Sequence, residues 1–364
     1  MEKTRIGVIG CGNISSIYLQ NLTQRFASVT VTAVADLIPE RAREKAEKYG
    51  VPRVLETDAL LHDPEVDLVL NLTTPQGHYA ICHQALSAGK PVYVEKPLSI
   101  SLEHGLALKT LARHNGLLLG AAPDTFLGAG IQTCLDIIHS GVIGRPIGAT
   151  AFMTNHGHES WHPDPEFYYQ TGGGPMFDMG PYYLTALYAL LGPAKRVTGS
   201  TAISFKQRTI TSSKKNGQLI DVEVPTHVTG LIDFASGAIG TIITSFDVWA
   251  ADLPRIEIYG SKGTLSVPDP NTFAGPVRIR LAGEQDFHPV DMDRPHQENS
   301  RGLGLVDMAR AWREGACDHR ASGDLALHVL ESMHAFHQAS DENRHIYLKT
   351  SFTQPAPLER DACY

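Results

Sequence analysis

The stretch that decides the fold runs from Arg5 to Ser15 and reads RIGVIGCGNIS. Arg5–Ile9 has the composition of a short strand, and a helical pattern follows from about residue 13 to residue 25. Between them, the first glycine permits a tight turn, and the second lets a pyrophosphate approach the N–H groups at the helix N-terminus. Ser15, at the third position, is small enough for close helix–strand packing. The stretch predicts a dinucleotide-binding turn whose cofactor-binding residues are Gly10, Gly12, Asn13 and Ile14.

The residues after this turn alternate between strand and helix patterns. Strands are predicted at residues 29–35, 66–72, 91–94 and 117–120, and helices at 39–49, 77–87 and 101–114. Continuous apolar strands separated by helices are typical of a parallel sheet that is covered on both faces. We therefore predict an N-terminal Rossmann domain over residues 1–123.

An acidic residue ends the second strand of this domain. Asp36 lies 24 residues after Gly12, where a carboxylate can accept hydrogen bonds from the adenosine ribose hydroxyls and would repel a 2′-phosphate. Arg41 is the nearest cation. The pattern favours NAD, with NADP possible. The alternative is a simple glycine turn beside a helix-capping aspartate.

The rest of the chain has a different pattern. Helices are predicted at residues 130–138, 176–191, 303–313 and 324–339, and strands at 146–153, 227–234, 239–246, 255–259 and 264–267. The polar segment 284–300 is predicted to be a loop. Strands spaced by turns indicate an antiparallel sheet. The predicted fold class is α/β, with an α+β domain over residues 124–364 that contains a large, open, mainly antiparallel sheet.

Composition narrows the class of protein. The 364 residues are 42% hydrophobic and carry a net charge of −8, which fits a globular protein and disfavours a nucleic-acid partner. The sequence contains no apolar run of membrane-spanning length and no secretory signal pattern, so no membrane partner is expected. Five scattered cysteines without a CxxC pair indicate neither a disulfide framework nor a zinc site. These features predict a cytoplasmic protein.

Four motifs occur together in a recognisable order. They are the turn at Gly10–Gly12, Thr74-Pro75 with His78, Glu95-Lys96-Pro97, and Gly172-Gly173-Gly174 followed by Asp178, Gly180 and Tyr182. In this combination the chain resembles the glucose-fructose oxidoreductase/inositol dehydrogenase (Gfo/Idh/MocA) family. The resemblance implies hydride transfer between NAD(P) and a secondary alcohol or ketone of a sugar, polyol or related cyclic compound. It also implies cofactor contacts from Thr74, Pro75, His78, Glu95 and Lys96.

The same resemblance implies three catalytic residues. Lys96 follows a parallel strand at the edge where such sheets bind ligands, and its ammonium can stabilise a developing alkoxide. Asp178 and Tyr182 are four residues apart on one predicted helix and so share a face. Tyr182 stands where many relatives carry histidine, and we expect its phenol to take the substrate proton while Asp178 holds a hydroxyl. The alternatives are a surface role for Lys96, a core role for Tyr182, and Tyr183 as the acting phenol.

A loop rich in histidine precedes the triple glycine. Its imidazoles and indole can recognise sugar hydroxyls and C–H groups, so the substrate-binding residues are predicted to be Thr125, His156, His158, Trp161, His162 and Asp178. Thr125 is in this set because it follows the last Rossmann strand, and its neighbour Asp124 is also expected to face the pocket. A plain surface or interface loop is the first alternative, and a metal site is the second. No metal is predicted, because the spacing matches no familiar ligand pattern.

Other functions remain possible at this level. One is a glycosidase that uses NAD transiently through a keto-sugar, and another is a non-catalytic NAD-binding regulator. A metal-dependent enzyme built on residues 156–162 is the third. The partial alternation in residues 227–234 and 239–246 leaves apolar residues on both sheet faces. An uncovered apolar face is an aggregation hazard, so a homodimer or homotetramer is predicted.

Overall fold

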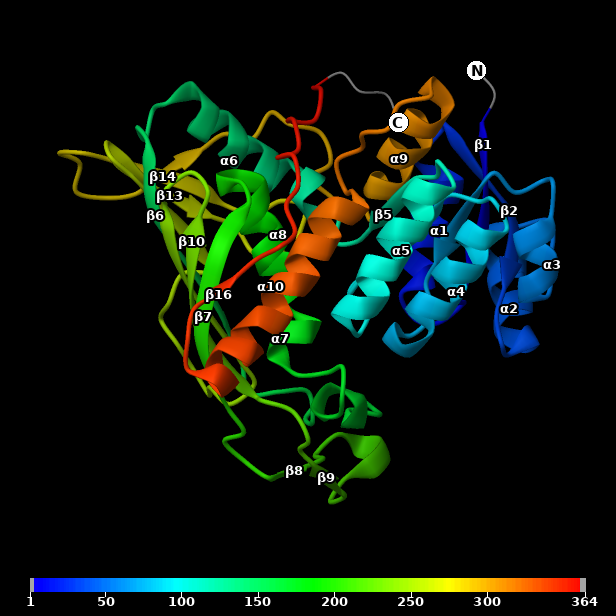
Figure 1. The fold of residues 1–364 in the computed structure, drawn as a ribbon, viewed down its shortest axis with the longest axis horizontal. Coiled ribbons are helices and arrows are strands. Elements are labelled where there is room, and N and C mark those ends of the chain that lie inside the picture. Colours follow the sequence, from blue (N-terminus) through cyan, green and yellow to red (C-terminus); the bar gives the residue numbers. More distant parts are fainter. Residues whose placement is uncertain (1–2, 361–364) are drawn as a thin grey trace. The chain divides into compact units, whose positions relative to one another are not determined.

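The computed structural model describes residues 3–360, which divide into two compact units (Figure 1). Of the described residues, unit 1 contains 3–128, His296–Leu330 and 355–360. Unit 2 contains Ala129–Pro295 and Glu331–Gln354. The predicted second domain was continuous, whereas part of the chain beyond Pro295 packs in unit 1.

Unit 1 is built on a five-stranded parallel sheet in the order β2-β1-β3-β4-β5. Its strands are β1 (Thr4–Ile9), β2 (Val29–Ala35), β3 (Leu68–Asn71), β4 (Val92–Val94) and β5 (Leu119–Ala121). The chain order reverses beside β1, and open α/β sheets bind ligands at the carboxyl ends of strands at such a switch point. The predicted Rossmann sheet is confirmed.

Helices connect the strands of unit 1. They are α1 (Ser15–Gln24), α2 (Pro39–Tyr49), α3 (Thr57–His62), α4 (Pro75–Ser87), α5 (Leu102–His114), η1 (Thr125–Leu127) and α9 (Leu303–Glu314). α2 begins at a proline and is closed by Gly50 in the left-handed conformation, while the hydroxyl of Ser101 caps α5. The six-residue α3 was not predicted, because so short a helix shows little periodicity.

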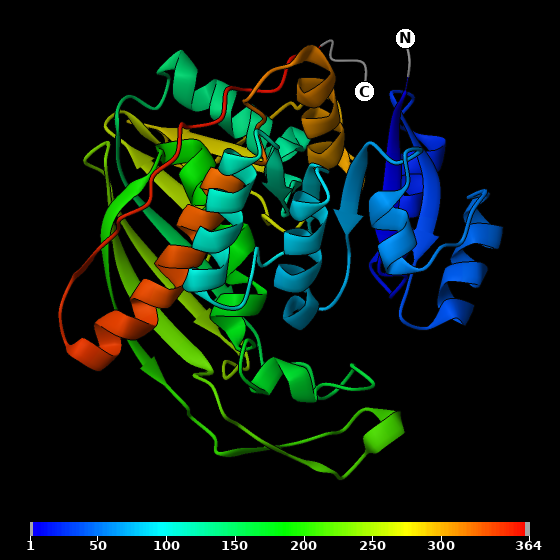
Figure 2. The same ribbon diagram turned by 45° about the vertical axis from the view of Figure 1, so that its right-hand side comes forward.

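Unit 2 contains a nine-stranded sheet in the order β15-β14-β13-β12-β6-β11-β10-β7-β16 (Figure 2). Its strands are β6 (Pro146–Thr154), β7 (Ala194–Ala202), β10 (His227–Phe234), β11 (Ile239–Ser245), β12 (Ile256–Gly260), β13 (Gly263–Val267), β14 (Val277–Leu281), β15 (His288–Val290) and β16 (Ile346–Tyr347). β6 and β11 pair in parallel and the other neighbours are antiparallel. The predicted large, mainly antiparallel sheet is confirmed. The loop predicted over 284–300 was wrong in part, because it contains β15.

The remaining elements of unit 2 are helices and one hairpin. They are α6 (Ala129–Ser140), η2 (Glu166–Tyr169), α7 (Pro175–Asp178), α8 (Gly180–Leu191), η3 (Ser213–Lys215), the hairpin β8 (Gln207–Thr209) and β9 (Leu219–Asp221), and α10 (Gly323–Glu342), whose first residues belong to unit 1. On β10, Val228, Ile232 and Phe234 are buried with Gly230. A Cβ at Gly230 would lie 2.4 Å from the ring of Phe336, so glycine lets α10 close against the strand.

The single helix predicted over residues 176–191 is two helices. α7 ends at Asp178 and α8 begins at Gly180, with Met179 between them. Pro181 has no N–H to continue the ladder of α7 and is favourable in the first turn of a new helix. The inference that Asp178 and Tyr182 share a face of one helix was therefore wrong.

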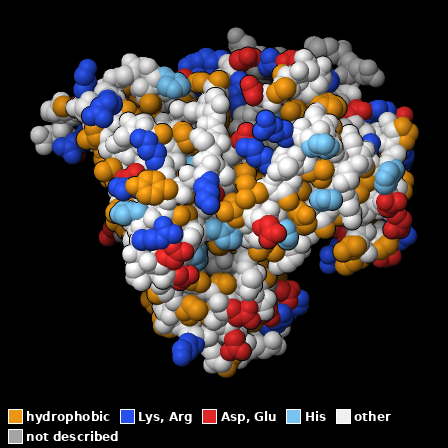
Figure 3. Space-filling model, viewed as in Figure 1, with side chains coloured by type: hydrophobic (Ala, Val, Ile, Leu, Met, Phe, Trp, Pro, Cys, Tyr) orange, Lys and Arg blue, Asp and Glu red, His pale blue; other side chains and the backbone are white. Residues whose placement is uncertain are grey.

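The surface carries both signs of charge. On the face drawn in Figure 3, Lys and Arg side chains are interspersed with Asp and Glu and do not form one charged field. Among residues 3–360, no helix is long and apolar enough to cross a membrane.

Candidate functional site

The turn after β1 has the geometry that a phosphate-binding loop requires. Gly10 has φ +100°, and a Cβ there would lie 2.5 Å from the carbonyl carbon of Leu72. No side chain could therefore occupy this position without displacing the backbone after β3. At Gly12 a Cβ would meet no atom within 4 Å, so the space beside this residue is open.

The helix after the turn begins without a side-chain cap from the described residues. Ile14 is the N-cap residue, and Ser15 Oγ donates to the carbonyl oxygen of Gly12 at 2.6 Å. Nζ of Lys45 donates to the hydroxyl of Ser16 in the first turn of the helix, which brings a cation to this end. An open glycine, a helix N-terminus and a nearby ammonium fit the pyrophosphate of a dinucleotide.

Asp36 joins the ends of β1 and β2. Its Oδ2 accepts a hydrogen bond from the N–H of Cys11 at 2.7 Å, and its Oδ1 accepts one from the N–H of Ile38 at 2.8 Å. The carboxylate is thus held against the glycine turn, and its remaining lone pairs suit the two hydroxyls of a ribose. The donor set of this edge fits an adenine dinucleotide.

Glu95 and Lys96 follow β4. The buried Glu95 carboxylate accepts hydrogen bonds from the Tyr18 phenol at 2.9 Å and from the N–H of Lys96 at 2.8 Å. The Lys96 side chain is half-buried, and its peptide bond to Pro97 is cis. Glu95 therefore fixes the backbone from which the proposed catalytic ammonium extends.

The predicted cofactor contacts after β3 are divided between surface and interior. Thr74 is exposed as the N-cap residue of α4, and Pro75 is the first residue of that helix. His78 is 1% exposed, with Nδ1 2.7 Å from the carbonyl oxygen of Pro97 and Nε2 3.0 Å from that of Thr73. Burial lowers the pKa of His78, and a neutral ring can donate to only one carbonyl. His78 therefore lies between the turns after β3 and β4 and contacts the backbone of both.

Asp124 and Thr125, predicted to face a substrate pocket, are buried. Oδ2 of Asp124 accepts hydrogen bonds from the N–H groups of Gly302 and Gly304 at 2.8 and 3.0 Å, at the start of α9. Burial raises the pKa of Asp124 to about 6. Thr125 is 2% exposed, so its position does not support a direct contact with substrate.

Unit 2 brings two of the predicted residues together. Nε2 of His158 lies 3.5 Å from a carboxylate oxygen of Asp178. The buried imidazole stacks on Tyr168 with ring centroids 3.7 Å apart and meets Phe246 edge-on at 4.7 Å. Its Nδ1 has no hydrogen-bond partner among the described residues. The ring is therefore fixed by aromatic packing, with one nitrogen beside Asp178.

The two adjacent tyrosines have different surroundings. Tyr182 lies in the first turn of α8, shortly after Asp178, and little of it is exposed. Tyr183 is more deeply buried, and burial raises the pKa of its phenol well above the ordinary value. Of the two phenols, Tyr182 is the better candidate for proton transfer.

The other residues of the histidine loop have different neighbours. His156 stacks on Trp249 with centroids 3.4 Å apart, while Trp161 is 62% exposed. Nδ1 of the half-buried His162 accepts a hydrogen bond from the N–H of Asp164 at 3.1 Å, and burial lowers the pKa of His162. Among residues 3–360, no three His, Cys, Asp or Glu side chains are grouped so that they could hold a metal ion.

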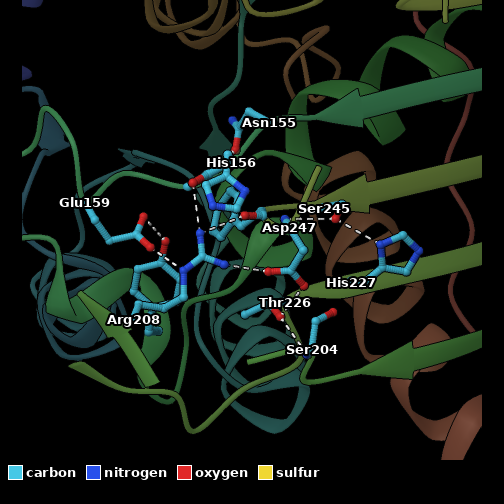
Figure 4. A network of polar contacts seen from close by, with 12 residues as sticks. Asn155, His156, Glu159, Ser204, Arg208, Thr226, His227, Ser245 and Asp247 are labelled. Atoms are coloured by element: carbon cyan, nitrogen blue, oxygen red, sulfur yellow. Dashed lines mark hydrogen bonds and ion pairs between the residues drawn. The ribbon is translucent and has the colours of Figure 1, made fainter. Parts of the chain in front are cut away.

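Sequence reasoning missed the residue that fastens this loop (Figure 4). Arg208, on β8, is buried and donates to the carboxylates of Glu159 and Asp247 and to the carbonyl oxygen of His156. Glu159 also accepts a hydrogen bond from the Tyr169 phenol at 2.6 Å. The acidic partners are 49 and 39 residues from the arginine, so no local pattern indicates the network.

Comparison with known proteins agrees with this geometry. Residues 4–122 match the family described as "Oxidoreductase family, NAD-binding Rossmann fold", and residues 131–266 match "GFO/IDH/MocA C-terminal domain". Together the matches cover well over half of the chain. Together with the dinucleotide turn, the family matches show a nicotinamide-dependent oxidoreductase that acts on CH–OH groups, with NAD as its cofactor. The chain belongs to the GFO/IDH/MocA family.

Individual relatives show the range of this similarity. The chain is 26% identical to myo-inositol 2-dehydrogenase of Thermotoga maritima over 72% of its length and 74% of that protein. It is 34% identical to dTDP-3,4-didehydro-2,6-dideoxy-alpha-D-glucose 3-reductase of Streptomyces violaceoruber, over 54% of this chain and 57% of that one. The crystal structure of levoglucosan dehydrogenase with NADH has the same fold, with a TM-score of 0.81, 19% identity, and coverage of 96% of this chain and 100% of that chain.

Proposed function

We propose that the chain oxidises a secondary alcohol of a sugar, polyol or related cyclic compound, or reduces the corresponding ketone. The observation that carries the proposal is the pair of Asp178 and His158, 3.5 Å apart in an aromatic surrounding. A carboxylate and an imidazole held in this way can bind a substrate hydroxyl through hydrogen bonds. The names of the inositol dehydrogenase and sugar-nucleotide reductase relatives support ring alcohols and ketones as the substrate class.

The proposed catalytic residues have distinct roles. Bound NAD supplies the hydride acceptor. The ammonium of Lys96 stabilises negative charge on the substrate oxygen, and Tyr182 in its phenolate form takes the hydroxyl proton and becomes the phenol. Asp178 accepts a hydrogen bond from substrate. Support for these roles comes from the fixed backbone at Lys96, the paired carboxylate at Asp178 and the deeper burial of Tyr183.

The proposed substrate contacts lie mainly on the histidine loop. His158 is held beside Asp178, and the exposed indole of Trp161 offers an aromatic face to sugar C–H groups. We also propose substrate contacts from His156, His162 and Thr125. Of these, Thr125 has the least support because it is buried.

Domain roles and assembly form a second part of the proposal. Residues 1–123 bind the cofactor, and residues 124–364 bind substrate and form a homodimer or homotetramer. The outer face of the nine-stranded sheet supports assembly, because Leu231 and Ile239 there are 46% and 56% exposed. Light scattering that finds only the 39.6 kDa chain would contradict it.

We also infer a cytoplasmic location without nucleic-acid or membrane partners. The acidic net charge supports this inference, as do Cys11, Cys82 and Cys134, which are buried as free thiols.

A substrate screen tests the proposed function. Purified protein is incubated with NAD or NADP and a panel of sugars, polyols and cyclic alcohols, and reduced nicotinamide is followed by absorbance. At least one ring alcohol should give steady NADH accumulation. Release of sugar from glycosides without net NADH would instead indicate a glycosidase.

A further inference from the structure

Unit 2 contains a cavity of about 590 Å³ beside the histidine loop. Its walls come from four residues of that loop, from the strand β8 and from two aromatic side chains, Phe205 and Trp249. The loop residues are His156, Gly157, Glu159 and Ser160. Asp178, Tyr182 and His158 are not among its lining residues, so the cavity is separate from the catalytic residues proposed above. Its volume lies within the range of small-molecule binding sites.

Two aromatic rings give the cavity apolar faces. Trp249 is 83% exposed although one side of its indole is covered by the stacked ring of His156. Phe205 is 48% exposed, and the guanidinium of Arg208 lies 5.4 Å from the centre of its ring. The indole is thus held flat, with most of its surface open to a ligand. Such a face packs well against the C–H groups of a saturated ring.

The polar groups of the lining are mostly neutral. Side chains alternate along β8, so Gln207 and Thr209 are exposed while Arg208 points into the protein. Ser160 and Thr211 add two exposed hydroxyls. Amide and hydroxyl groups of this kind both donate to and accept from the hydroxyls of a polyol.

The charges at this wall disfavour an anionic ligand. Among the described residues that line the cavity, Arg208 is the only lysine or arginine. Glu159, Asp247 and two backbone carbonyls accept its hydrogen bonds. Asp247 does not line the cavity, so within the lining one cation faces one carboxylate. Because the hydrogen bonds of this guanidinium already go to protein acceptors, a phosphate or carboxylate group gains little attraction here.

We propose that this cavity binds a neutral, polyhydroxylated ring, namely one sugar residue. The ligand class follows from the lining and goes beyond the oxidation proposed above. The ring comes from one of two sources: a second ring linked to the oxidised one, or a separate sugar molecule. His156 and Glu159 line the cavity, and His158 between them contacts Asp178, so a bound ring also holds the loop that places His158 beside Asp178.

Calorimetry without cofactor tests the site with D-glucose, myo-inositol and maltose as probes. The Asp178→Ala background weakens sugar binding at the catalytic residues, so the heat reports on the cavity. At least one of the single-ring probes should bind, and glucose 6-phosphate should bind more weakly than glucose. Trp249→Ala should weaken binding by about tenfold or more because the stacking face is lost, and Phe205→Ala should act in the same direction. Tyr347→Ala, which removes another exposed aromatic of unit 2, should leave binding unchanged.

Calorimetry of the protein with Asp178 intact distinguishes a ring linked to the oxidised sugar from a separate sugar molecule. A linked ring predicts that maltose binds at least about tenfold more tightly than glucose and that Trp249→Ala abolishes this gain. A separate molecule predicts two glucose molecules per chain and no gain for maltose.

Three results would overturn the proposal. The first is that no probe binds, and the second is that folded Trp249→Ala and Phe205→Ala both bind as the parent does. The third is that light scattering shows either substitution to change the oligomeric state, which would make this wall a subunit interface. NADH formation is measured separately, so failure here and failure of the proposed oxidation are distinguishable.

Discussion

Glu95 accepts hydrogen bonds from the Tyr18 phenol and from the N–H of Lys96, and Asp36 accepts them from the N–H groups of Cys11 and Ile38. Both carboxylates therefore have a structural role in addition to the cofactor-binding role that is predicted for them. Each holds a turn at the carboxyl end of a strand, where a cofactor of this fold binds. A substitution that removes only the charge separates the two roles.

Asp36 is expected to make NAD a better cofactor than NADP. Asp36→Asn keeps an oxygen that can accept the N–H of Cys11 but removes the charge that repels a 2′-phosphate. The ratio of kcat/KM for NAD to that for NADP should fall, and Asp36→Ala should also narrow it. A parent enzyme that uses NADP at least as efficiently as NAD would refute this role.

Tyr182 is expected to take the substrate proton. Tyr182→Phe keeps the ring and removes the hydroxyl, so kcat should fall by roughly 10²- to 10⁴-fold while NAD affinity stays nearly unchanged. Tyr183→Phe is the matched control, since it removes a phenol that lies in the core, and kcat should stay near the parent value. If Tyr182→Phe keeps a normal kcat, the base is another group, and the loop histidines would be substituted next.

At the scale of elements, the hairpin β8–β9 anchors the histidine loop through Arg208. This guanidinium connects the loop at His156 and Glu159 to Asp247, which follows β11. The hydroxyl of Thr226 also donates a hydrogen bond to the carboxylate of Asp247, with 2.6 Å between the oxygens. The network attaches the loop to β8 and to the end of β11, and so holds His158 beside Asp178.

Arg208→Met should strongly destabilise the protein. It leaves two buried carboxylates without their cation, and breaking a buried ion pair in this way costs about 3–5 kcal/mol. The free energy of unfolding in urea measures the loss. Arg280→Met, at an exposed arginine on β14, should cost less than about 1 kcal/mol. Equal losses for the two variants would show that the network contributes little.

The elements that sequence predicted best are those with strong local signals. The strand over Val29–Ala35, the helix over Pro39–Tyr49 and the strand over His227–Phe234 have the predicted bounds, because β-branched runs, an initial proline and a closing glycine are local features. The break at Met179 was missed because apolar periodicity continues across it. The hairpin β8–β9 was missed because its three-residue strands are mostly exposed.

At the scale of the whole molecule, sequence was sufficient for the fold class and the dinucleotide turn. It could not show that His78 and Thr125 are buried, since burial depends on packing between segments distant in sequence. Nor could it separate His158, which contacts Asp178, from His156, which stacks on Trp249. The sequence shows that three histidines lie on one loop, but the contacts of each ring depend on the fold.

The free energy of unfolding should decrease when the pH is lowered from 7 towards 5. Burial lowers the pKa of His296, His319 and His337 to about 4, below the value near 6.5 of an unfolded chain. The folded state therefore favours the neutral rings. Their contribution is complete above pH 6.5 and is lost as pH falls towards 4, in total by about a few kcal/mol after allowance for partial exposure.

Urea unfolding at several values between pH 5 and 7 measures this loss above the range where most carboxylates titrate. His319→Gln should flatten the pH profile, whereas His345→Gln, at an exposed histidine, should not. A stability that is constant across this range would contradict the assignment.

Transfer of label from substrate tests the central claim most directly. The best substrate from the screen is deuterated at the carbon to be oxidised and incubated with NAD, and the reduced cofactor and product are analysed by mass spectrometry. We predict one deuterium in each NADH and one ketone formed per NADH. Unlabelled NADH, or turnover of substrate with no net NADH, would contradict the account of this protein as a dehydrogenase.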